Sequence, residues 1–555
     1  MSIELLAPLD LAFWQLESAG HPLHLGALAL FGTAGPTTPE GRRTGSTTER
    51  PGGGSGAAVL FGSGSGPAPR AAAPSGSGSG SGFESGAGFA DRRRPTARGS
   101  APGGARPDSG ADPGAAPDPG ADPGAAPDPG ADTILGLLAA RAAAVPWLRR
   151  RVRGVLLPVG GAAWSVDKDF DVRRHVHRIR LPAGDLAERA VAVAGELMER
   201  PLERGRPPWE MYLLTGAPGG PFAVLVKLHH ALADGMRAVA IGSAVFDETA
   251  PTAATTARRG PGRSEPPGRR AWFADPARLL RADPARFLGL ARDRVDDLGR
   301  AVGVGASVVL ASRLDAGGLS SLTAGPSGTR RLATVELDLE RVRAIRRAVG
   351  GTLNDVLLAV VAGGLRRWAR QRGDALPARG PRALVPVSRR RPGSAPGAGN
   401  RLSAYLLELP LAEPDPRVRL DAVRAAMDRN KAAGPLRGAG AVAVLADQLP
   451  PLAHRFGTPL AKGAARMLFD LLVTSVPLPR AALSLGGVPL SALYPLAPLA
   501  RGQSLAVALT RYGDRVHIGL VADGEAVPDL DALGCGLREE LSVLSRLTPT
   551  AAPAH

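Results

Sequence analysis

The residues best suited to chemistry lie at the end of a mostly apolar run, Phe222 to Leu228. His229 and His230 follow this run directly, and Asp234 and Gly235 come shortly after them. A neutral imidazole can accept a proton from a hydroxyl group near physiological pH. The carboxylate of Asp234 can fix the loop, either by accepting hydrogen bonds from the backbone or by pairing with an arginine. The pattern suits general-base catalysis by one of the histidines.

The same segment also has a structural interpretation. Two neighbouring histidines can be ordinary loop or core residues, and Asp234 can cap the helix that we expect to begin after Gly235. The segment alone favours neither interpretation.

The apolar run before the histidines predicts the element that positions them. It is partly β-branched and follows a Pro-Gly-Gly-Pro turn, which indicates a buried strand. Strand ends in α/β proteins present reactive side chains on an accessible loop while the scaffold behind them stays rigid. We therefore expect the histidines between a strand and the helix that begins after Gly235.

Helical and strand patterns mix along the rest of the chain, which predicts an α/β fold with two domains. The chain has 555 residues and 44% apolar content, enough to build two cores. Helical patterns lie at 9–16, 134–142, 186–198, 272–314, 339–349 and 353–368. Strand patterns lie at 23–31, 222–228, 332–337, 383–387, 403–409, 505–511 and 515–521.

The composition separates folded from low-complexity parts. We expect the N-terminal half to comprise residues 1–32 and 133–249, and the C-terminal half residues 331–545. A Pro/Arg/Gly-rich linker with helices is expected at 250–330, and a disordered tail at 546–555.

Residues 33–132 are predicted to form a disordered low-complexity insertion. A decapeptide of Ala, Asp, Pro and Gly at 111–120 repeats at 121–130. Such a segment buries too little apolar surface to offset the entropy of ordering its backbone. A long surface insertion costs little closure entropy, so the surrounding fold can survive it.

The net charge of +17 does not indicate a nucleic-acid-binding protein. Four of the 68 basic residues are lysine, the arginines are scattered, and aromatic residues make up only 4%. Stacking platforms for bases would be scarce, and no helix-turn-helix or zinc-ligand pattern is present. Attraction to anionic lipid headgroups fits this charge better.

Cysteine usage and apolar runs suggest a cytoplasmic protein with peripheral membrane contact. Cys535 is the single cysteine, so no internal disulfide can form. The first residues lack the pattern of a secretion signal. The uncharged run Ala481 to Ala500 contains three prolines and a Gly-Gly pair, which favours strands and turns over a spanning helix.

Several motifs together resemble one enzyme family. Residues 229–235 read His-His-Ala-Leu-Ala-Asp-Gly, 206–210 read Arg-Pro-Pro-Trp-Glu, and 351–356 read Gly-Thr-Leu-Asn-Asp-Val. Further matching segments lie at 6–10, 21–26, 385–388, 399–401 and 494–496. The sequence resembles the bacterial wax ester synthase/diacylglycerol acyltransferase family of the coenzyme A-dependent acyltransferase superfamily. Departures are Pro208 in place of leucine, Ser475 and Leu478 in place of asparagine and glycine, and the insertion.

This resemblance implies two chloramphenicol-acetyltransferase-like domains, with mixed sheets flanked by helices and an active-site tunnel between them. His230 would be the general base, with His229 and Asp234 in support. The donor would be acyl-CoA, and the acceptor diacylglycerol or a long-chain alcohol, giving triacylglycerol or wax ester. No metal and no bound cofactor is expected. The protein would work on the inner membrane face or on lipid droplets, and its oligomeric state stays open.

Substrate-binding residues are expected among Trp209, Asn354 and Asp355. Each has a structural alternative, because Trp209 suits a packing anchor and the Asn-Asp pair suits a helix N-terminus. His24 is favoured as a structural histidine. A nucleophilic role for Cys535 is disfavoured because no histidine lies near it in the sequence.

Two other functions remain open. A non-catalytic lipid-binding or droplet-coating protein could keep the fold, and the departures at Ser475 and Leu478 favour it, whereas intact His230 and Asp234 argue against it. A condensation-type acyltransferase of secondary metabolism shares the histidine motif. The Asn354-Asp355 pair favours the storage-lipid family over that alternative.

Overall fold

The computed structural model describes the two folded halves of the chain. Its described residues are 4–18, 20–32, 128–156, 160–249, 319–323, 327–388, 402–433, 469–479, 481–500 and 502–547. Most of the predicted insertion, most of the predicted linker with its helix at 272–314, the turn at 399–401 and most of the predicted tail lie outside these residues.

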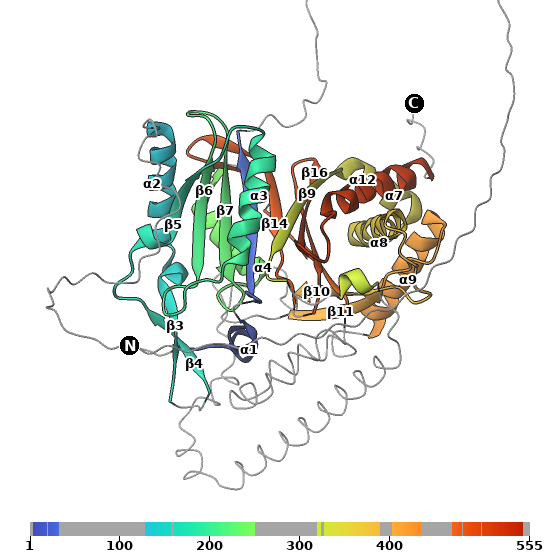
Figure 1. The fold of residues 1–555 in the computed structure, drawn as a ribbon, viewed down its shortest axis with the longest axis horizontal. Coiled ribbons are helices and arrows are strands. Elements are labelled where there is room, and N and C mark those ends of the chain that lie inside the picture. The colour runs from blue at the N-terminus through green and yellow to red at the C-terminus, as the bar shows by residue number, and fades with distance from the viewer. Residues whose placement is uncertain are drawn as a thin grey trace, which may run out of the picture. The chain divides into compact units, whose positions relative to one another are not determined.

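A seven-stranded sheet carries the histidine motif (Figure 1). The strand order is β5 (Val176–Arg180), β6 (Trp209–Thr215), β7 (Phe222–His229), β2 (His24–Phe31), β14 (Val488–Leu496), β13 (Ala482–Leu485) and β8 (Asp247–Thr249). Every residue of β7 is buried, because apolar side chains cover both faces of the sheet. This burial explains why the sequence before the motif is apolar without alternation.

Two strands of this sheet come from the C-terminal part of the chain. Strand β14 pairs with β2 in antiparallel register, and β13 pairs with β14 and β8. The uncharged run Ala481 to Ala500 therefore forms strands and turns, as predicted. The sequence did not indicate that these strands join the sheet of the N-terminal half.

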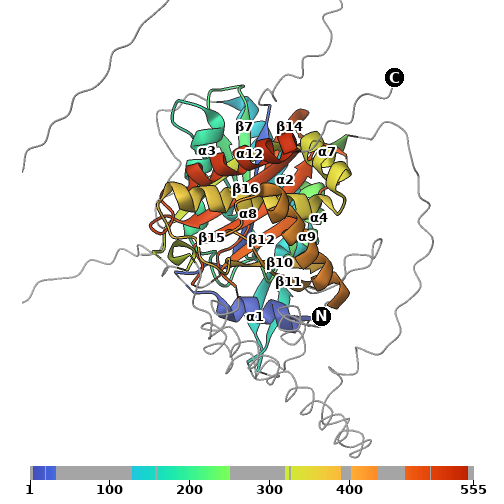
Figure 2. The same ribbon diagram turned by 90° about the vertical axis from the view of Figure 1, so that its right-hand side faces the viewer.

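The second large sheet is mixed and has six strands. Its order is β11 (Leu402–Glu408), β10 (Arg382–Ser388), β12 (Leu471–Val476), β15 (Leu505–Tyr512), β16 (Arg515–Asp523) and β9 (Arg330–Asp338). Strand β12 is parallel to both neighbours, and the other pairs are antiparallel. Four helices cover it (Figure 2): α7 (Leu339–Val349), α8 (Leu353–Gln371), α9 (Pro416–Ala433) and α12 (Leu530–Leu547).

The two sheets share a hydrophobic core around helix α3 (Leu186–Glu199). Side chains of α3, β2 and β7 pack with Leu332 of β9 and with Ala506 and Ala508 of β15. Gly519 of β16 lies so close to β14 that a Cβ atom there would be 2.0 Å from the Pro495 carbonyl oxygen. Only glycine permits this approach. The α/β class with mixed sheets flanked by helices is confirmed.

Helix α2 (Pro129–Ala144) corrects the predicted end of the insertion. Its cap, Asp128, accepts a hydrogen bond from the Ala131 amide at 3.2 Å, and Pro129 suits the first helical position. Asp128 and Asp132 also pair with Arg178 at 3.0 and 2.8 Å. Residues 128–132, predicted to be disordered, therefore belong to a capped and anchored helix.

A smaller sheet lies next to the first helix. It has the order β1 (Glu4–Leu5), β4 (Ala162–Val166) and β3 (Arg150–Gly154). Helix α1 (Pro8–Leu16) follows β1 directly. The prediction identified α1 but none of these three strands.

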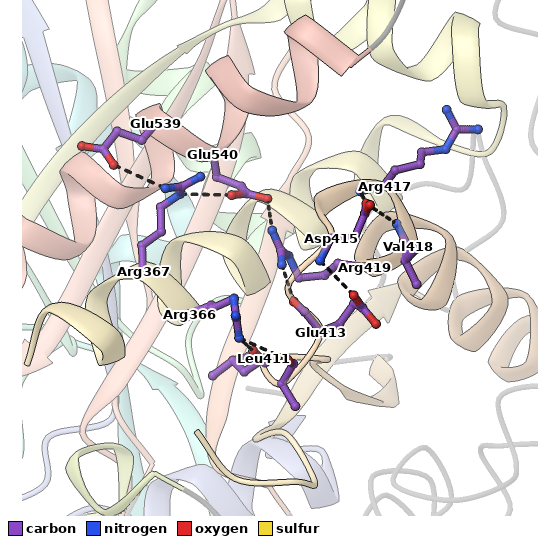
Figure 3. Close-up of polar contacts among 11 residues, drawn as sticks. Arg366, Arg367, Leu411, Glu413, Asp415, Arg417, Val418, Arg419, Glu539 and Glu540 are labelled. Atoms are coloured by element: carbon purple, nitrogen blue, oxygen red, sulfur yellow. Dashed lines mark hydrogen bonds and ion pairs between the residues drawn. The ribbon is translucent and has the colours of Figure 1, made fainter. Parts of the chain in front are cut away.

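A buried ion network ties α8, α9 and α12 together (Figure 3). Glu540 is fully buried and contacts Arg419 at 2.5 Å and Arg367 at 3.1 Å. Arg419 also donates to the Glu413 carbonyl at 2.6 Å. A Cβ on Gly363 of α8 would lie 2.1 Å from the Glu540 carboxyl carbon. The missing side chain at Gly363 thus makes room for the carboxylate.

Among the described helices, none taken singly has the length and apolar character to cross a bilayer. Helices α7 and α8 meet the criterion only as a pair, bent by 106°. Most of α8 is buried in the protein core.

Candidate active site

The end of β7 fixes the backbone of both histidines. The His229 amide donates to the Pro208 carbonyl at 3.0 Å, and the His230 amide donates to the Leu23 carbonyl at 2.9 Å. The end of the strand is therefore held on both sides, and His230 is only partly buried there.

His229 points into the protein. Its Nδ1 accepts a hydrogen bond from the Ala231 amide at 3.0 Å, so Nε2 carries the proton of the neutral ring. This Nε2 lies 3.4 Å from Oε1 of Glu17. The rings of Trp14 and His229 pack in a T-shaped arrangement, with centroids 4.9 Å apart. Full burial and these partners fit the predicted supporting role.

Glu17 follows α1 and is an acidic partner that the sequence did not predict for the site. Burial opposes its ionisation, but His229, the Leu23 amide and Arg204 outweigh burial and hold the pKa of Glu17 below its usual value. The Leu23 amide donates to Oε1 at 3.2 Å, and Arg204 lies 3.2 Å from Oε2. The ionised carboxylate thus anchors the segment before β2 to His229.

His230 is covered by Phe13. The two rings stack with centroids 4.0 Å apart and an angle of 23° between them. Burial lowers the pKa of His230 to about 4; His229 adds to the shift, and the negative charge of Asp234 opposes it. The imidazole is therefore neutral at physiological pH, which is the form that can accept a proton.

Asp234 caps helix α4 (Gly235–Val245). Its carboxylate accepts from the Arg237 amide at 2.8 Å. The Arg237 guanidinium donates to the Leu232 carbonyl at 3.1 Å and lies 4.5 Å from the centre of the Trp147 ring. The helix-cap interpretation of Asp234 is therefore correct, and the cap holds the loop behind His230 as a support should. A pairing of Asp234 with an arginine stays a prediction.

Trp209 lies in the core. It is 0% exposed, and its Nε1 donates to the Leu148 carbonyl at 2.6 Å. Its ring stacks on His175 with centroids 4.7 Å apart. This geometry favours the packing anchor over the substrate contact, because a fully buried indole presents no surface to a ligand.

Asn354 and Asp355 take different places at the start of α8. Asp355 is buried and forms a capping box, in which its carboxylate accepts from the Thr352 amide at 2.8 Å and its amide donates to Thr352 Oγ1 at 3.2 Å. Asn354 lines a cavity of about 510 Å³ together with Ser475. The structural alternative therefore holds for Asp355, while Asn354 is available to a ligand.

The cavity lies next to the histidine motif rather than around His230. Ser475 precedes Val476, and a Cβ on Gly235 would lie 3.8 Å from Cγ2 of Val476. The end of β12 thus lies between the start of α8 and the start of α4. The predicted tunnel between the halves stays a prediction.

The structure also shows where His24 and Cys535 lie, two residues that the sequence analysis did not favour for catalysis. The Nε2 atom of buried His24 is 2.8 Å from the Met198 carbonyl oxygen, and burial together with Lys227 holds its pKa well below the usual value. Lys227 is fully buried and donates to the Leu197 and Arg200 carbonyls at the end of α3. Cys535 is exposed on α12.

Helix α1 and the residue directly after it supply the site residues that sequence reasoning missed. Phe13, Trp14 and Glu17 contact the two histidines from more than two hundred positions away in the chain. Two aromatic residues followed by an acid, with helical spacing between Phe13 and Glu17, were the available signal. Within the described part of the chain, no cluster of three or more His, Cys, Asp or Glu side chains could hold a metal.

Comparison with known proteins agrees with the motifs. Residues 116–357 match the wax ester synthase/diacylglycerol acyltransferase catalytic domain, and residues 398–545 match the C-terminal domain of that family. Two Mycobacterium tuberculosis proteins, tgs1 and tgs2, each named a probable diacylglycerol O-acyltransferase, are 31% and 30% identical over 422 and 417 residues. These alignments cover 74% of this chain in both cases, and 87% and 89% of the relatives.

A solved structure shares the fold. The wax ester synthase/diacylglycerol acyltransferase from Marinobacter aquaeolei VT8 is 20% identical, with a TM-score of 0.57 over 98% of this chain and 100% of that one. The expected architecture of two chloramphenicol-acetyltransferase-like domains is thereby confirmed.

Proposed function

This chain belongs to the wax ester synthase/diacylglycerol acyltransferase family and is an acyltransferase of that type, and we propose that it moves a long-chain acyl group from acyl-CoA to diacylglycerol. The product is triacylglycerol, and a long-chain alcohol gives wax ester as a second product. Diacylglycerol comes first because tgs1 and tgs2 carry diacylglycerol acyltransferase names.

His230 acts as the general base in a direct transfer. The neutral imidazole takes the proton from the hydroxyl group of the acceptor while the oxygen of that hydroxyl attacks the thioester carbonyl carbon. The tetrahedral intermediate then collapses, the carbon–sulfur bond breaks, and the coenzyme A thiolate takes the proton from His230. A thiolate leaves readily because thiols have a pKa of about 8.5. Ester and free coenzyme A are the products.

The observation that carries this proposal is the state of the His230 ring. His230 is not fully buried and stacks on Phe13, and burial keeps the pKa of its ring low, while adjacent His229 is fully buried and engaged with Glu17 and the Ala231 amide. Only one of the two imidazoles is therefore placed to meet a substrate. Asp234 positions the loop and touches no reacting atom in this proposal.

The test compares single histidine variants in folded protein. Thiol release from palmitoyl-CoA is measured with diacylglycerol, with hexadecanol and without acceptor. We expect His230→Ala to lose roughly 10²–10⁴-fold in kcat/KM, since general-base catalysis contributes that much. His229→Ala should retain more activity, and His177→Ala, on β5 away from the motif, serves as the matched control.

The acceptor arms distinguish the alternatives. If thiol release is the same with and without an acceptor and no ester forms, the result would favour the non-catalytic lipid-binding protein. Near-normal turnover of His230→Ala, together with an inactive His229→Ala, would show that the base is wrongly assigned.

We also propose that the protein docks peripherally on the inner membrane face or on lipid droplets. Long-chain substrates reside there, and the chain carries a charge of +17. Leu156, just beyond β3, is 93% exposed, and neighbouring Arg153 is exposed too. An exposed apolar side chain and an exposed cation three positions apart in the chain suit an anionic lipid surface.

A further inference from the structure

The cavity at the start of α8 is lined by cations. Arg343, Arg346 and Arg347 reach it from α7, and Arg511 reaches it from β15. None of the described residues that line it carries a carboxylate. Its volume of about 510 Å³ is in the range of small-molecule sites.

Helical spacing brings three of these arginines together. Arg343, Arg346 and Arg347 are exposed neighbours on the surface of α7, whereas Val342 and Ile345 are buried. Glu340 pairs with Arg343 at 3.5 Å and with Arg347 at 2.5 Å. Over the described residues, neither Arg346 nor Arg511 forms an ion pair. Glu340 balances part of the charge of Arg343 and Arg347, but Arg346 and Arg511 add two further positive charges to the same cavity. Because nearby like charges repel one another, an anionic ligand would stabilise the arrangement.

Residues at the start of α8 line the same cavity. Gly350 and Gly351 both have φ of +78°, and this turn brings the start of α8 against the end of α7. The first amides of α8, at Leu353 and Asn354, have no intrahelical acceptor. A helix N-terminus with free amides favours phosphate, and guanidinium groups bind phosphate in bidentate fashion.

The position of the cavity indicates which kind of phosphate-containing ligand binds there. Ser475 lines it, and the next residue, Val476, packs toward Gly235 directly after the histidine motif. Thr510, beside Arg511, donates to the Val476 carbonyl at 2.7 Å. A ligand whose phosphates fill the cavity would therefore have its remaining arm beside the loop that carries His230.

We propose that this arginine cavity binds the 3′-phosphate and diphosphate of the coenzyme A part of the donor substrate. The inference rests on the proposed acyl-CoA specificity. Arg346 and Arg511 are the principal ligands because no carboxylate of the described residues pairs with either, and Asn354 and the α8 amides complete the site. The pantetheine arm then runs past Ser475 toward the motif.

The test uses the double variant Arg346→Gln/Arg511→Gln in the full chain. Both side chains are exposed and unpaired within the described structure, so glutamine should not disturb folding. We expect KM for palmitoyl-CoA to rise roughly 10- to 100-fold, the loss expected for charged hydrogen bonds, with kcat within about twofold. KM for palmitoyl-pantetheine, which lacks these phosphates, should not change. Arg341→Gln, exposed on α7 and outside the cavity, is the matched control.

Binding of free coenzyme A by calorimetry tests the site independently of turnover. We expect the double variant to bind at least about tenfold more weakly than wild type and Arg341→Gln. This result would stand even if no acceptor were acylated, which would overturn the proposed function alone. Equal coenzyme A affinity in wild type and double variant, or no affinity in either, overturns the cavity assignment. The assignment is also overturned if the double variant selectively loses binding to phosphatidylglycerol vesicles, because lipid headgroups would then be the occupant.

Discussion

Replacing Phe13 with alanine should raise the pKa of His230 and move the acid limb of catalysis. Phe13 covers one face of the imidazole, with ring centroids 4.0 Å apart. Burial disfavours the cationic ring, so the pKa falls from 6.5 to about 4. Removing the cover lets water reach one face and stabilise the imidazolium.

The size of the shift follows from the cover that is lost. The whole displacement of His230 corresponds to at most about 3 kcal/mol, at 1.36 kcal/mol per pKa unit. Phe13 supplies one face of a partly exposed ring, and we assign it about 1 unit of pKa. At pH 4.5 the neutral fraction of His230 should then fall about threefold, while at pH 7.5 it should hardly change.

The assay is the pH profile of kcat/KM for palmitoyl-CoA, supported by an NMR titration of the His230 ring. Wild type should show an acid limb near pH 4, and Phe13→Ala a limb near pH 5. Phe13→Leu keeps an apolar cover and should titrate like wild type. A wild-type limb near 6.5, or identical limbs in wild type and Phe13→Ala, would refute the argument that this stacked cover sets the pKa.

Three further predictions concern stability, the insertion and lipid contact. Glu540→Ala should lower the free energy of unfolding, measured by urea denaturation, by about 3–5 kcal/mol, because Arg419 stays buried without its partner. Glu540→Gln should lower it less, and equal losses in the two variants would contradict the argument from charge. Replacing residues 34–118 with a short Gly/Ser linker should leave melting temperature and turnover nearly unchanged, and a large fall in either would show that the segment packs on the fold. Binding to anionic vesicles, measured by flotation, should weaken at 1 M salt, where the Debye length is roughly 3 Å, and Leu156→Asp should weaken it further. Vesicle binding that does not change with salt would contradict the electrostatic part of the docking proposal.

The elements that the sequence predicted well are those whose pattern is local. The apolar run before His229 is β7, the helix after Gly235 is α4, and the period of apolar residues at 339–349 is α7. Each pattern reflects burial of a single face or of a whole strand, which a short window of sequence records. Strands β3 and β5 were missed because arginine and histidine interrupt their alternation.

The candidate site divides in the same way. His230 and Asp234 are neighbours in the chain, so their motif could be read from the sequence, and the cap geometry of Asp234 follows from its place before a helix. The end of the insertion was placed too late because Asp128 and Pro129 lie inside a repeat of low complexity. Their role as a helix start depends on Arg178, a residue far away in the chain.

The sequence by itself determined the fold class, the family and the strand–loop–helix unit that carries His230. Only the tertiary structure decided that α1 covers the two histidines, that β13 and β14 complete the sheet of the other half, and that four arginines face one cavity. The physical reason is that periodicity encodes which face of an element is buried, whereas the partner of that face is chosen by packing between distant segments. The neutral state of His230 belongs to this second class, because the ring of Phe13 that covers it comes from the opposite end of the N-terminal half.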